Sequence, residues 1–432
     1  METKLVRIAE ISATSKHPIF TSVYHLINED MLKQCHKELD GNKAVGIDKV
    51  TKDEYGKNLD RNIKELVQRL KNKSFKPLPS LRVYIPKGNG KKRPLGIASY
   101  EDKIVQMAVK KILGAIYEPR FLNCMYGFRP NRGCHEAIKE VYQRISYGKI
   151  SYIVDADIKG FFDHIDHDWM MKFLEWNIQD KNLLWLIRKY LKVGIMEQGK
   201  FEPTEEGSAQ GSVMSPMLAN IYMHHVLTLW FKLVVQREMQ GECFLVNFAD
   251  DFVAGFQYKW EAENYYKLLK ERMEKFGLQL EDSKSRLLQS GAYIARAKQK
   301  SGECIRLQTF DFLGFTFYCG RSRKGMPYIM PKTSSKKFRQ KIRDIKVWLY
   351  VNRDQPLKKL MGMLNLKLIG HYRYYGISFN GRMISNYKQQ VRELLFKVLN
   401  RRSDRKSYTR EGFIEMLKYY PLAMPKIYVS LF

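Results

Sequence analysis

Residues 244–256 read FLVNFADDFVAGF, and this segment decides the fold. Two adjacent carboxylates, Asp250 and Asp251, separate two apolar runs that are rich in strand-forming residues. Because such runs favour extended backbone and Asp favours turns, the segment predicts a β-hairpin with the acids at its tip. Turn chemistry alone is a sufficient reason for two aspartates, so a second acidic site is needed before the hairpin indicates catalysis.

Residues 151–163, which read SYIVDADIKGFFD, supply that second site. Asp155 and Asp157 share one face of the predicted strand, and only Asp157 lies at its end, where it could meet Asp250. Carboxylates from two strands, with no His or Cys cluster beside them, suit a hard cation such as Mg2+. Two such ions, roughly 3.5 to 4 Å apart, support in-line phosphoryl transfer, so the pattern predicts polymerase chemistry.

The charge of the chain indicates a polyanionic partner. The 432 residues include 75 Lys plus Arg against 45 Asp plus Glu, a formal net charge of +30. Residues 321–432 hold 26 basic and 6 acidic residues, so this last quarter carries +20 of that charge. An excess of this size favours nucleic acid, and the C-terminal quarter is the strongest candidate for holding it.

Cysteine use and hydropathy exclude other classes of protein. The six cysteines form no C-x-x-C pair, which argues against a zinc site or a disulfide framework. No uninterrupted apolar run reaches the ~18 residues that a membrane helix needs. We therefore expect a soluble, intracellular protein with no membrane partner, and a length that allows two or three domains.

Periodicity predicts the remaining elements. Amphipathic helices are expected over residues 21–39, 52–70, 101–116 and 260–276, and basic helices over 334–352, 356–375 and 380–400. Residues 81–96 predict a β-hairpin with cations at its mouth, although a solvated basic hairpin would look the same. Ser215 and Pro216 predict the N-cap and first residue of a long helix.

Several motifs, in this order, resemble the palm of a reverse transcriptase: Asp157 with Phe161, Gln210-Gly211 before Ser215-Pro216, and Phe248-Ala249-Asp250-Asp251. Together with the flanking blocks, they are similar to the group II intron-encoded reverse transcriptase and maturase family, of the type without an endonuclease module. The resemblance implies an α+β right-hand fold, with fingers and palm built from antiparallel sheet and helices and with a helical thumb. The implied divisions are an N-terminal extension (1–75), fingers (76–150), palm (151–320) and a basic thumb or maturase domain (321–432).

The resemblance also implies a function, which is RNA-directed DNA polymerisation with help to intron splicing and mobility in a bacterial cytoplasm. The implied partners are intron RNA, an RNA template, a DNA primer or target DNA, and dNTPs. The implied cofactor is a pair of Mg2+ ions, with Mn2+ as the alternative. A domesticated or defence-associated reverse transcriptase, and an RNA-binding splicing chaperone that no longer polymerises, are the competing hypotheses.

Site residues follow from the resemblance, position by position. Asp157, Asp250 and Asp251 would be catalytic and would bind metal with the backbone carbonyl of Ile158. Nucleotide contacts are implied for Lys87, Arg93, Gln210, for Phe161 as a steric gate against the 2′-hydroxyl, and for Lys284 as the acid that protonates pyrophosphate. Template or primer contacts are implied for Arg129, Arg132, Phe248, Gly314 and Arg373. The chain departs from the family at Phe248, where Tyr is usual, and at Asn247, where Arg is frequent.

Overall fold

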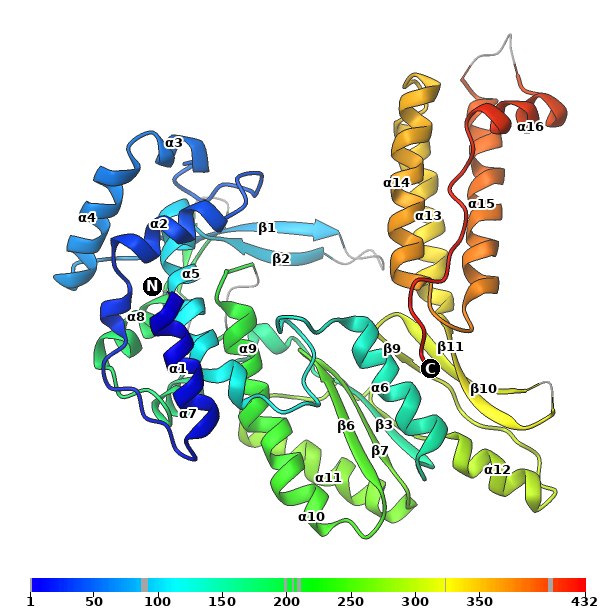
Figure 1. The fold of residues 1–432 in the computed structure, drawn as a ribbon, viewed down its shortest axis with the longest axis horizontal. Helices are drawn as coiled ribbons and strands as arrows, with labels where there is room; N and C mark the ends of the chain where they lie inside the picture. Colours follow the sequence, from blue (N-terminus) through cyan, green and yellow to red (C-terminus); the bar gives the residue numbers. More distant parts are fainter. Residues whose placement is uncertain are drawn as a thin grey trace.

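The computed structural model describes residues 2–86, 92–197, 200–203, 206–207, 211–322, 324–402 and 407–432 (Figure 1). The helices are α1 (Glu2–Thr14), η1 (Tyr24–Leu26), α2 (Glu29–Glu38), α3 (Lys52–Gly56), α4 (Leu59–Lys71), α5 (Tyr100–Tyr117), η2 (Glu118–Arg120), α6 (Cys134–Tyr147), η3 (Phe161–Asp163), α7 (His167–Glu175), α8 (Lys181–Leu191), α9 (Ser215–Met223), η4 (His224–Thr228), η5 (Phe231–Val235), α10 (Gln236–Glu238), α11 (Lys259–Lys275), α12 (Ala292–Lys300), α13 (Ser335–Val351), α14 (Leu357–Tyr375), α15 (Gly381–Leu399) and α16 (Arg410–Tyr419). The strands are β1 (Ser80–Pro86), β2 (Lys92–Ile97), β3 (Tyr152–Asp157), β4 (Ile195–Glu197), β5 (Lys200–Glu202), β6 (Cys243–Phe248), β7 (Asp251–Phe256), β8 (Arg286–Gln289), β9 (Phe310–Phe312), β10 (Phe315–Arg321) and β11 (Pro327–Thr333).

A four-stranded antiparallel sheet, in the order β6-β7-β3-β8, forms the centre of the molecule. The predicted hairpin is its β6–β7 pair, and the predicted acidic strand is β3, which lies beside β7. With two further sheets and helices on both sides, the α+β class is confirmed. Figure 1 shows the N-terminal helices on one side of this central sheet and the helices α13–α15 on the other.

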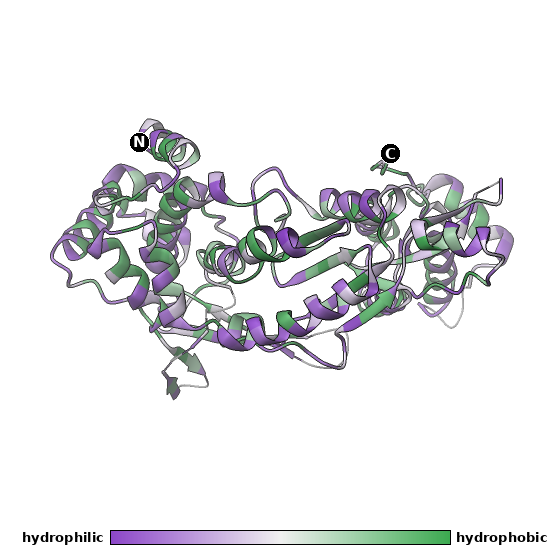
Figure 2. Cartoon of the chain, turned by 90° about the horizontal axis from the view of Figure 1, so that it is seen from below, coloured by the Kyte–Doolittle hydropathy of each residue, from purple (hydrophilic) through white to green (hydrophobic). Residues whose placement is uncertain are grey.

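The two faces of the central sheet belong to different hydrophobic cores, because alternate strand residues point to opposite faces. One core takes Val154, Leu245 and Ala254 and extends through α1, α2, α5 and α9. The other takes Ile153, Val246 and Val253 and continues into α6 and the helices α13–α15. Figure 2 shows helices that carry both purple and green residues, as expected where one side of a helix is buried.

The β1–β2 hairpin belongs to a second sheet, in the order β2-β1-β4-β5, and extends toward the helices α13–α15 (Figure 1). Its antiparallel register runs from Leu81 opposite Ile97 to Pro86 opposite Lys92. The hairpin predicted from residues 81–96 is therefore confirmed. Its turn lies outside the described residues, as does Lys87.

The long helix of residues 215–238 is built from α9 and α10 with two π-helical segments, η4 and η5, between them. The helix begins one residue earlier than predicted. Met214 is the N-cap and Ser215 is the first helical residue, so the prediction of Ser215 as the N-cap was wrong. This helix is long and apolar enough to cross a membrane, but 72% of its apolar 18-residue stretch is buried inside the protein. We therefore describe it as a core helix, which packs against α5 and α7.

The C-terminal part combines a three-stranded sheet, β11-β10-β9, with the helices α13–α15, which we call the thumb helices. The predicted ranges for these helices agree with the structure to within a few residues, whereas α16 was not predicted. Two of the proposed domain boundaries, at 75 and 150, fall between elements, and the third, at 320, falls inside β10. The division of the chain into four domains stays a prediction.

Candidate active site

The central hairpin places its acids at the end of the sheet. β6 ends at Phe248, Ala249 and Asp250 form the loop, and β7 begins at Asp251. Asp157, the last residue of β3, is the direct partner of Asp251 in the antiparallel ladder. Side chains that face each other in this way have Cβ atoms about 4.5 to 5.5 Å apart. The structure therefore brings Asp157 and Asp251 side by side, with Asp250 next to them on the loop.

Negative charge is concentrated at this end of the sheet. Asp251 is accessible from the cleft, yet partial burial, followed by Asp250, Asp157 and Asp155, raises its pKa to about 7. Burial also raises the pKa of Asp155 to about 6, although Arg286 lies 3.3 Å from its carboxylate and opposes the shift. Carboxylates that raise one another's pKa in this way are in a site that favours a cation.

Lys284 is a second cation, besides Arg286, that meets these acids. Its ammonium group forms an ion pair with Asp157, and this hydrogen bond raises the pKa of Lys284. Within the described residues, no three His, Cys, Asp or Glu side chains are grouped as a finished metal shell. The donor set nevertheless fits Mg2+, because the groups that converge here are carboxylate oxygens.

The predicted carbonyl ligand, Ile158, lies just beyond β3. The hydrogen bonds that join this segment to residues 279–281 use the N–H of Lys159 and the carbonyl of Asp157. The Ile158 carbonyl thus takes no part in this pair of bonds, and its role as a metal ligand stays a prediction.

A cleft of about 1110 Å3 opens over the acids. One wall consists of Phe248, Asp250 and Asp251 from the hairpin. Four lysines of the thumb helices also line the cleft, and these are Lys336, Lys337, Lys341 and Lys367. A cleft lined by both acids and cations can hold a polyanion and a metal together.

Of the predicted nucleotide contacts, Arg93 lines this cleft, and Lys284 lies beside Asp157. Arg93 is exposed on β2 and lines the cleft, as does Gly211. Gly211 has a φ of +112°, and a Cβ there would come within 2.8 Å of the Gly96 carbonyl oxygen. The loop therefore needs glycine at this position to pass so close to β2. Gln210 lies outside the described residues.

The predicted steric gate is not where the sequence placed it. Phe161 is only 2% exposed and packs in the core against Tyr222, with ring centroids 6.5 Å apart. The ring that lines the cleft belongs to the next residue, Phe162. A residue must reach the sugar in order to test it, so the structure does not support Phe161 in that role and brings Phe162 to the cleft instead.

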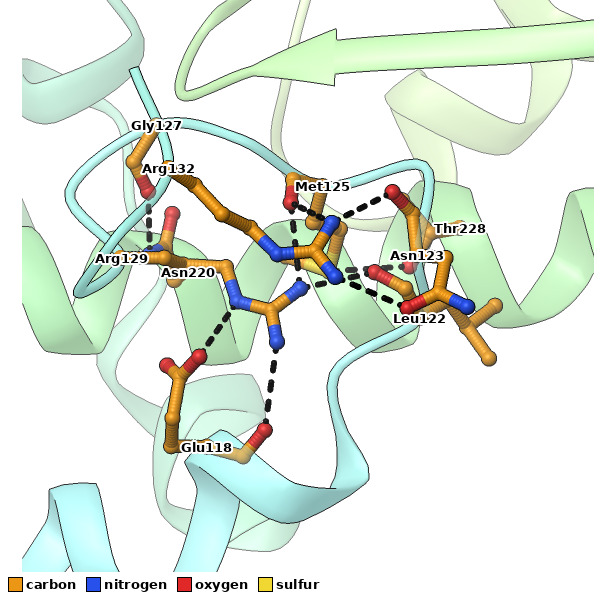
Figure 3. A network of polar contacts seen from close by, with 9 residues as sticks. All are labelled: Glu118, Leu122, Asn123, Met125, Gly127, Arg129, Arg132, Asn220 and Thr228. Carbon is orange, nitrogen blue, oxygen red and sulfur yellow. Dashed lines mark hydrogen bonds and ion pairs between the residues drawn. The ribbon is translucent and has the colours of Figure 1, made fainter. Parts of the chain in front are cut away.

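Arg129 and Arg132 are turned toward their own loop (Figure 3). The Arg129 guanidinium, with its side chain 6% exposed, pairs with Glu118 at 2.7 Å and donates to the carbonyls of Leu122 and Met125. Arg132 donates to the carbonyl and the side chain of Asn123. The prediction that Arg129 contacts template phosphates is not supported, because its guanidinium is buried and bonded inside the protein, whereas the contact predicted for the partly exposed Arg132 stays a prediction.

Of two further predicted template or primer contacts, one lines the cleft and the other does not. Gly314 lines the cleft at the β9–β10 turn, where Leu313 and Gly314 both have positive φ, as a type I′ turn requires. Arg373 is exposed on α14 and is not among the residues that line the cleft. The thumb lysines that do line it were missed, although the basic character of residues 334–352 was the signal that could have identified them.

Comparison with known proteins agrees with this geometry. Residues 85–317 match the family model described as reverse transcriptase (RNA-dependent DNA polymerase), and residues 335–414 match the group II intron, maturase-specific domain. The chain is 37% identical over 238 residues to the group II intron-encoded protein LtrA of Lactococcus lactis subsp. cremoris, covering 54% of this chain and 39% of LtrA. It is 37% identical over 187 residues to protein YkfC of Escherichia coli (strain K12), covering 43% of this chain and 49% of YkfC.

The chain thus spans about two fifths of LtrA and half of YkfC. The first family model alone covers more than half of the chain, from the β1–β2 hairpin through the acidic end of the central sheet to β10. The second covers the thumb helices α13–α15. The chain belongs to the reverse transcriptase family, in the group that group II introns encode and that carries a maturase domain.

Proposed function

We propose that this protein is an RNA-directed DNA polymerase of a group II intron, which copies intron RNA into DNA and assists its splicing and mobility. The observation that carries the proposal is the pairing of Asp157 with Asp251, which lines a cleft together with Asp250 and the thumb lysines. A polymerase needs carboxylates beside a surface that holds a nucleic-acid backbone.

We assign the following roles to the residues of the site. Asp157, Asp250 and Asp251 would hold two divalent ions, Mg2+ or Mn2+, which activate a primer 3′-hydroxyl and stabilise the leaving oxygen in an in-line transfer. Arg93 would orient the triphosphate through bidentate contacts, and Phe162 would lie against the sugar. Lys284, whose ammonium group pairs with Asp157, would donate a proton to pyrophosphate.

Other residues that line the cleft would hold the primer and template strands. Phe248 and Gly314 line the cleft and would contact the primer end, and the thumb lysines, which also line it, would contact phosphates. The match to a maturase-specific domain over residues 335–414 supports intron RNA as a second partner of the thumb. Because LtrA and YkfC are bacterial proteins, we place its action in a bacterial cytoplasm.

The test compares extension with splicing. Wild type and Asp250→Asn are assayed for primer extension on RNA and DNA templates with Mg2+, and for stimulation of group II intron splicing at low salt. We expect extension by wild type only, and splicing stimulation by both proteins, since Asp250→Asn keeps the shape of the side chain and leaves the thumb lysines in place. Splicing stimulation without any extension by wild type would contradict the proposal and favour a splicing chaperone.

A further inference from the structure

The loop that carries the catalytic acids has a backbone conformation that its own residues do not favour. Ala249 has a φ of +57°, in the left-handed region that costs a residue with a Cβ about 1 to 2 kcal/mol. A hairpin loop of two residues usually avoids this cost by placing Gly, Asn or Asp there. Something outside the loop must therefore hold Ala249 in place, and with it Asp250 and Asp251.

Asn247 supplies the first restraint. Its side chain is fully buried, and its Nδ2 donates to the carbonyl of Ala249 at 2.7 Å. Its Oδ1 is buried without a hydrogen-bond partner in the described part of the chain, so the bond to Ala249 is what fixes the side-chain amide. Because Ala249 is itself only 3% exposed, no water can readily replace that donor.

The loop before α6 supplies the second restraint. The N–H of Asn247 donates to the carbonyl of Cys124 at 2.8 Å, and the N–H of Tyr126 donates to the carbonyl of Asn247 at 2.8 Å. Gly127 follows directly, and a Cβ there would overlap with the Ala249 nitrogen. The loop thus lies against the catalytic turn along its backbone.

The arginines in Figure 3 hold this loop in turn. Arg129 donates to the carbonyls of Leu122 and Met125, and Asn220 donates to the carbonyl of Gly127 at 2.8 Å. The carbonyl of Met125 is thereby directed away from the hairpin, and the carbonyl of Cys124 toward it. The donors of Arg129 thus shape the backbone that contacts Asn247.

From these contacts we infer that Asn247 is a positioning residue for polymerisation: its side-chain amide locks the left-handed turn at Ala249 and so sets Asp250 and Asp251 against Asp157. The inference rests on the proposed function for its effect on rate. Its structural content, which is the lock itself, does not. The loop of residues 122–132 braces the lock from outside.

The experiment uses the full chain and three variants: Asn247→Leu, Ala249→Gly, and both together. Leu has nearly the shape of Asn but cannot donate, so Ala249 can leave its left-handed conformation. Gly adopts that conformation without help, so the double variant should regain the turn. Asn62→Leu is the matched control, because the side-chain amide of Asn62 on α4 also donates to a backbone carbonyl, that of Tyr55, and neither residue lines the cleft.

Single-nucleotide incorporation and amide hydrogen exchange of the peptide that spans residues 245–253 are measured for each protein. For Asn247→Leu we expect kcat to fall by up to about 100-fold with KM for dNTP nearly unchanged, and faster exchange in this peptide. The double variant should recover most of both losses, and Asn62→Leu should match wild type in both measurements.

Unchanged kcat and exchange in Asn247→Leu, or a loss that Ala249→Gly does not reverse, would overturn the lock. If wild type extends no primer, the proposed function fails, and the exchange data then decide the lock separately. Faster exchange that glycine reverses would support it, and unaltered exchange would refute it.

Discussion

At the scale of single residues, Gly127 lies where the catalytic turn leaves no room for a side chain. A Cβ there would overlap with the backbone nitrogen of Ala249, and backbone cannot move aside as a flexible side chain can. We expect Gly127→Ala to displace the turn and to slow extension by about 100-fold, the cost of a misplacement near 1 Å. Single-turnover extension measures this.

The control for that variant is Gly362→Ala on α14. Nothing lies within 4 Å of a Cβ at Gly362, so activity should persist. The helix should gain up to about 1 kcal/mol, because alanine favours helix over glycine. Equal rates for both variants would show that Gly127 makes no close approach that matters.

The two adjacent rings after β3 give a second residue-scale prediction. Phe162→Ala should let the enzyme incorporate ribonucleotides, because Phe162 lines the cleft. Phe161→Ala should instead lower stability by about 3 to 5 kcal/mol, as expected for a buried ring, and leave sugar discrimination as it is. Competition between dNTP and NTP, with urea unfolding, measures both. Altered discrimination in Phe161→Ala alone would contradict the assignment.

Sequence predicted the meeting of Asp157 with the hairpin acids because strand ends follow from apolar periodicity. It could not tell which of the two phenylalanines faces the cleft. The period of two holds only as far as Asp157; Gly160 then takes a φ of +54° and η3 begins. Arg129 was misread for another reason: a long side chain can turn back onto its own loop, and no pattern in the sequence records that choice.

At the scale of elements, the loop of residues 122–132 could either support the β6–β7 hairpin or contact the template, and salt dependence separates these two roles. A phosphate contact contributes about one unit to the slope of log affinity against log salt. We expect Arg129→Ala to leave that slope for primer-template unchanged and to lower stability by about 3 to 5 kcal/mol, since Glu118 keeps an unpaired charge in a mostly buried pair. Fluorescence anisotropy at several salt concentrations measures the slope.

Lys337→Ala is the comparison, because Lys337 lines the cleft from α13. Its removal should reduce the salt slope by about one unit and leave stability nearly as it is. A reduced slope for Arg129→Ala, with full stability, would return Arg129 to the template surface.

Element prediction succeeded where one periodic face was buried and failed where a local break intervened. The range 52–70 contains two helices, since α3 ends at Gly56 and α4 begins at Leu59. The range 21–39 contains η1 and α2, with Asn28 capping α2 through a bond from the Met31 N–H. These caps satisfy backbone groups locally, so an uninterrupted hydrophobic pattern did not require an uninterrupted helix.

At the scale of the whole molecule, three buried histidines link stability to pH. Burial lowers the pKa of His224 to about 3, of His225 to about 4 and of His371 to about 3, with nearby cations adding to each shift. The unfolded chain has histidines near 6.5 and so binds more protons below that pH. Stability is therefore fully present above pH 6.5 and is lost as pH falls, by about 1.4 kcal/mol per unit for each histidine.

His371→Phe isolates one of the three. The ring of His371 stacks on Tyr387 with centroids 3.6 Å apart, and both of its nitrogens lack hydrogen-bond partners in the described residues, so Phe can take its place. Urea unfolding at pH 7.5, 6.0 and 5.0 should show a shallower loss for the variant, by about 1.4 kcal/mol per pH unit. Parallel curves for the two proteins would show that His371 titrates normally.

The central claim concerns the whole site: carboxylates from β3 and from the β6–β7 hairpin act together on a nucleic acid held between the sheet and the thumb. Its most direct test is single-nucleotide incorporation by wild type, Asp157→Asn and Asp250→Asn, with primer-template affinity measured in parallel. We predict loss of incorporation by at least about a thousandfold in each variant, with affinity kept. Incorporation at the wild-type rate by either variant would contradict the account.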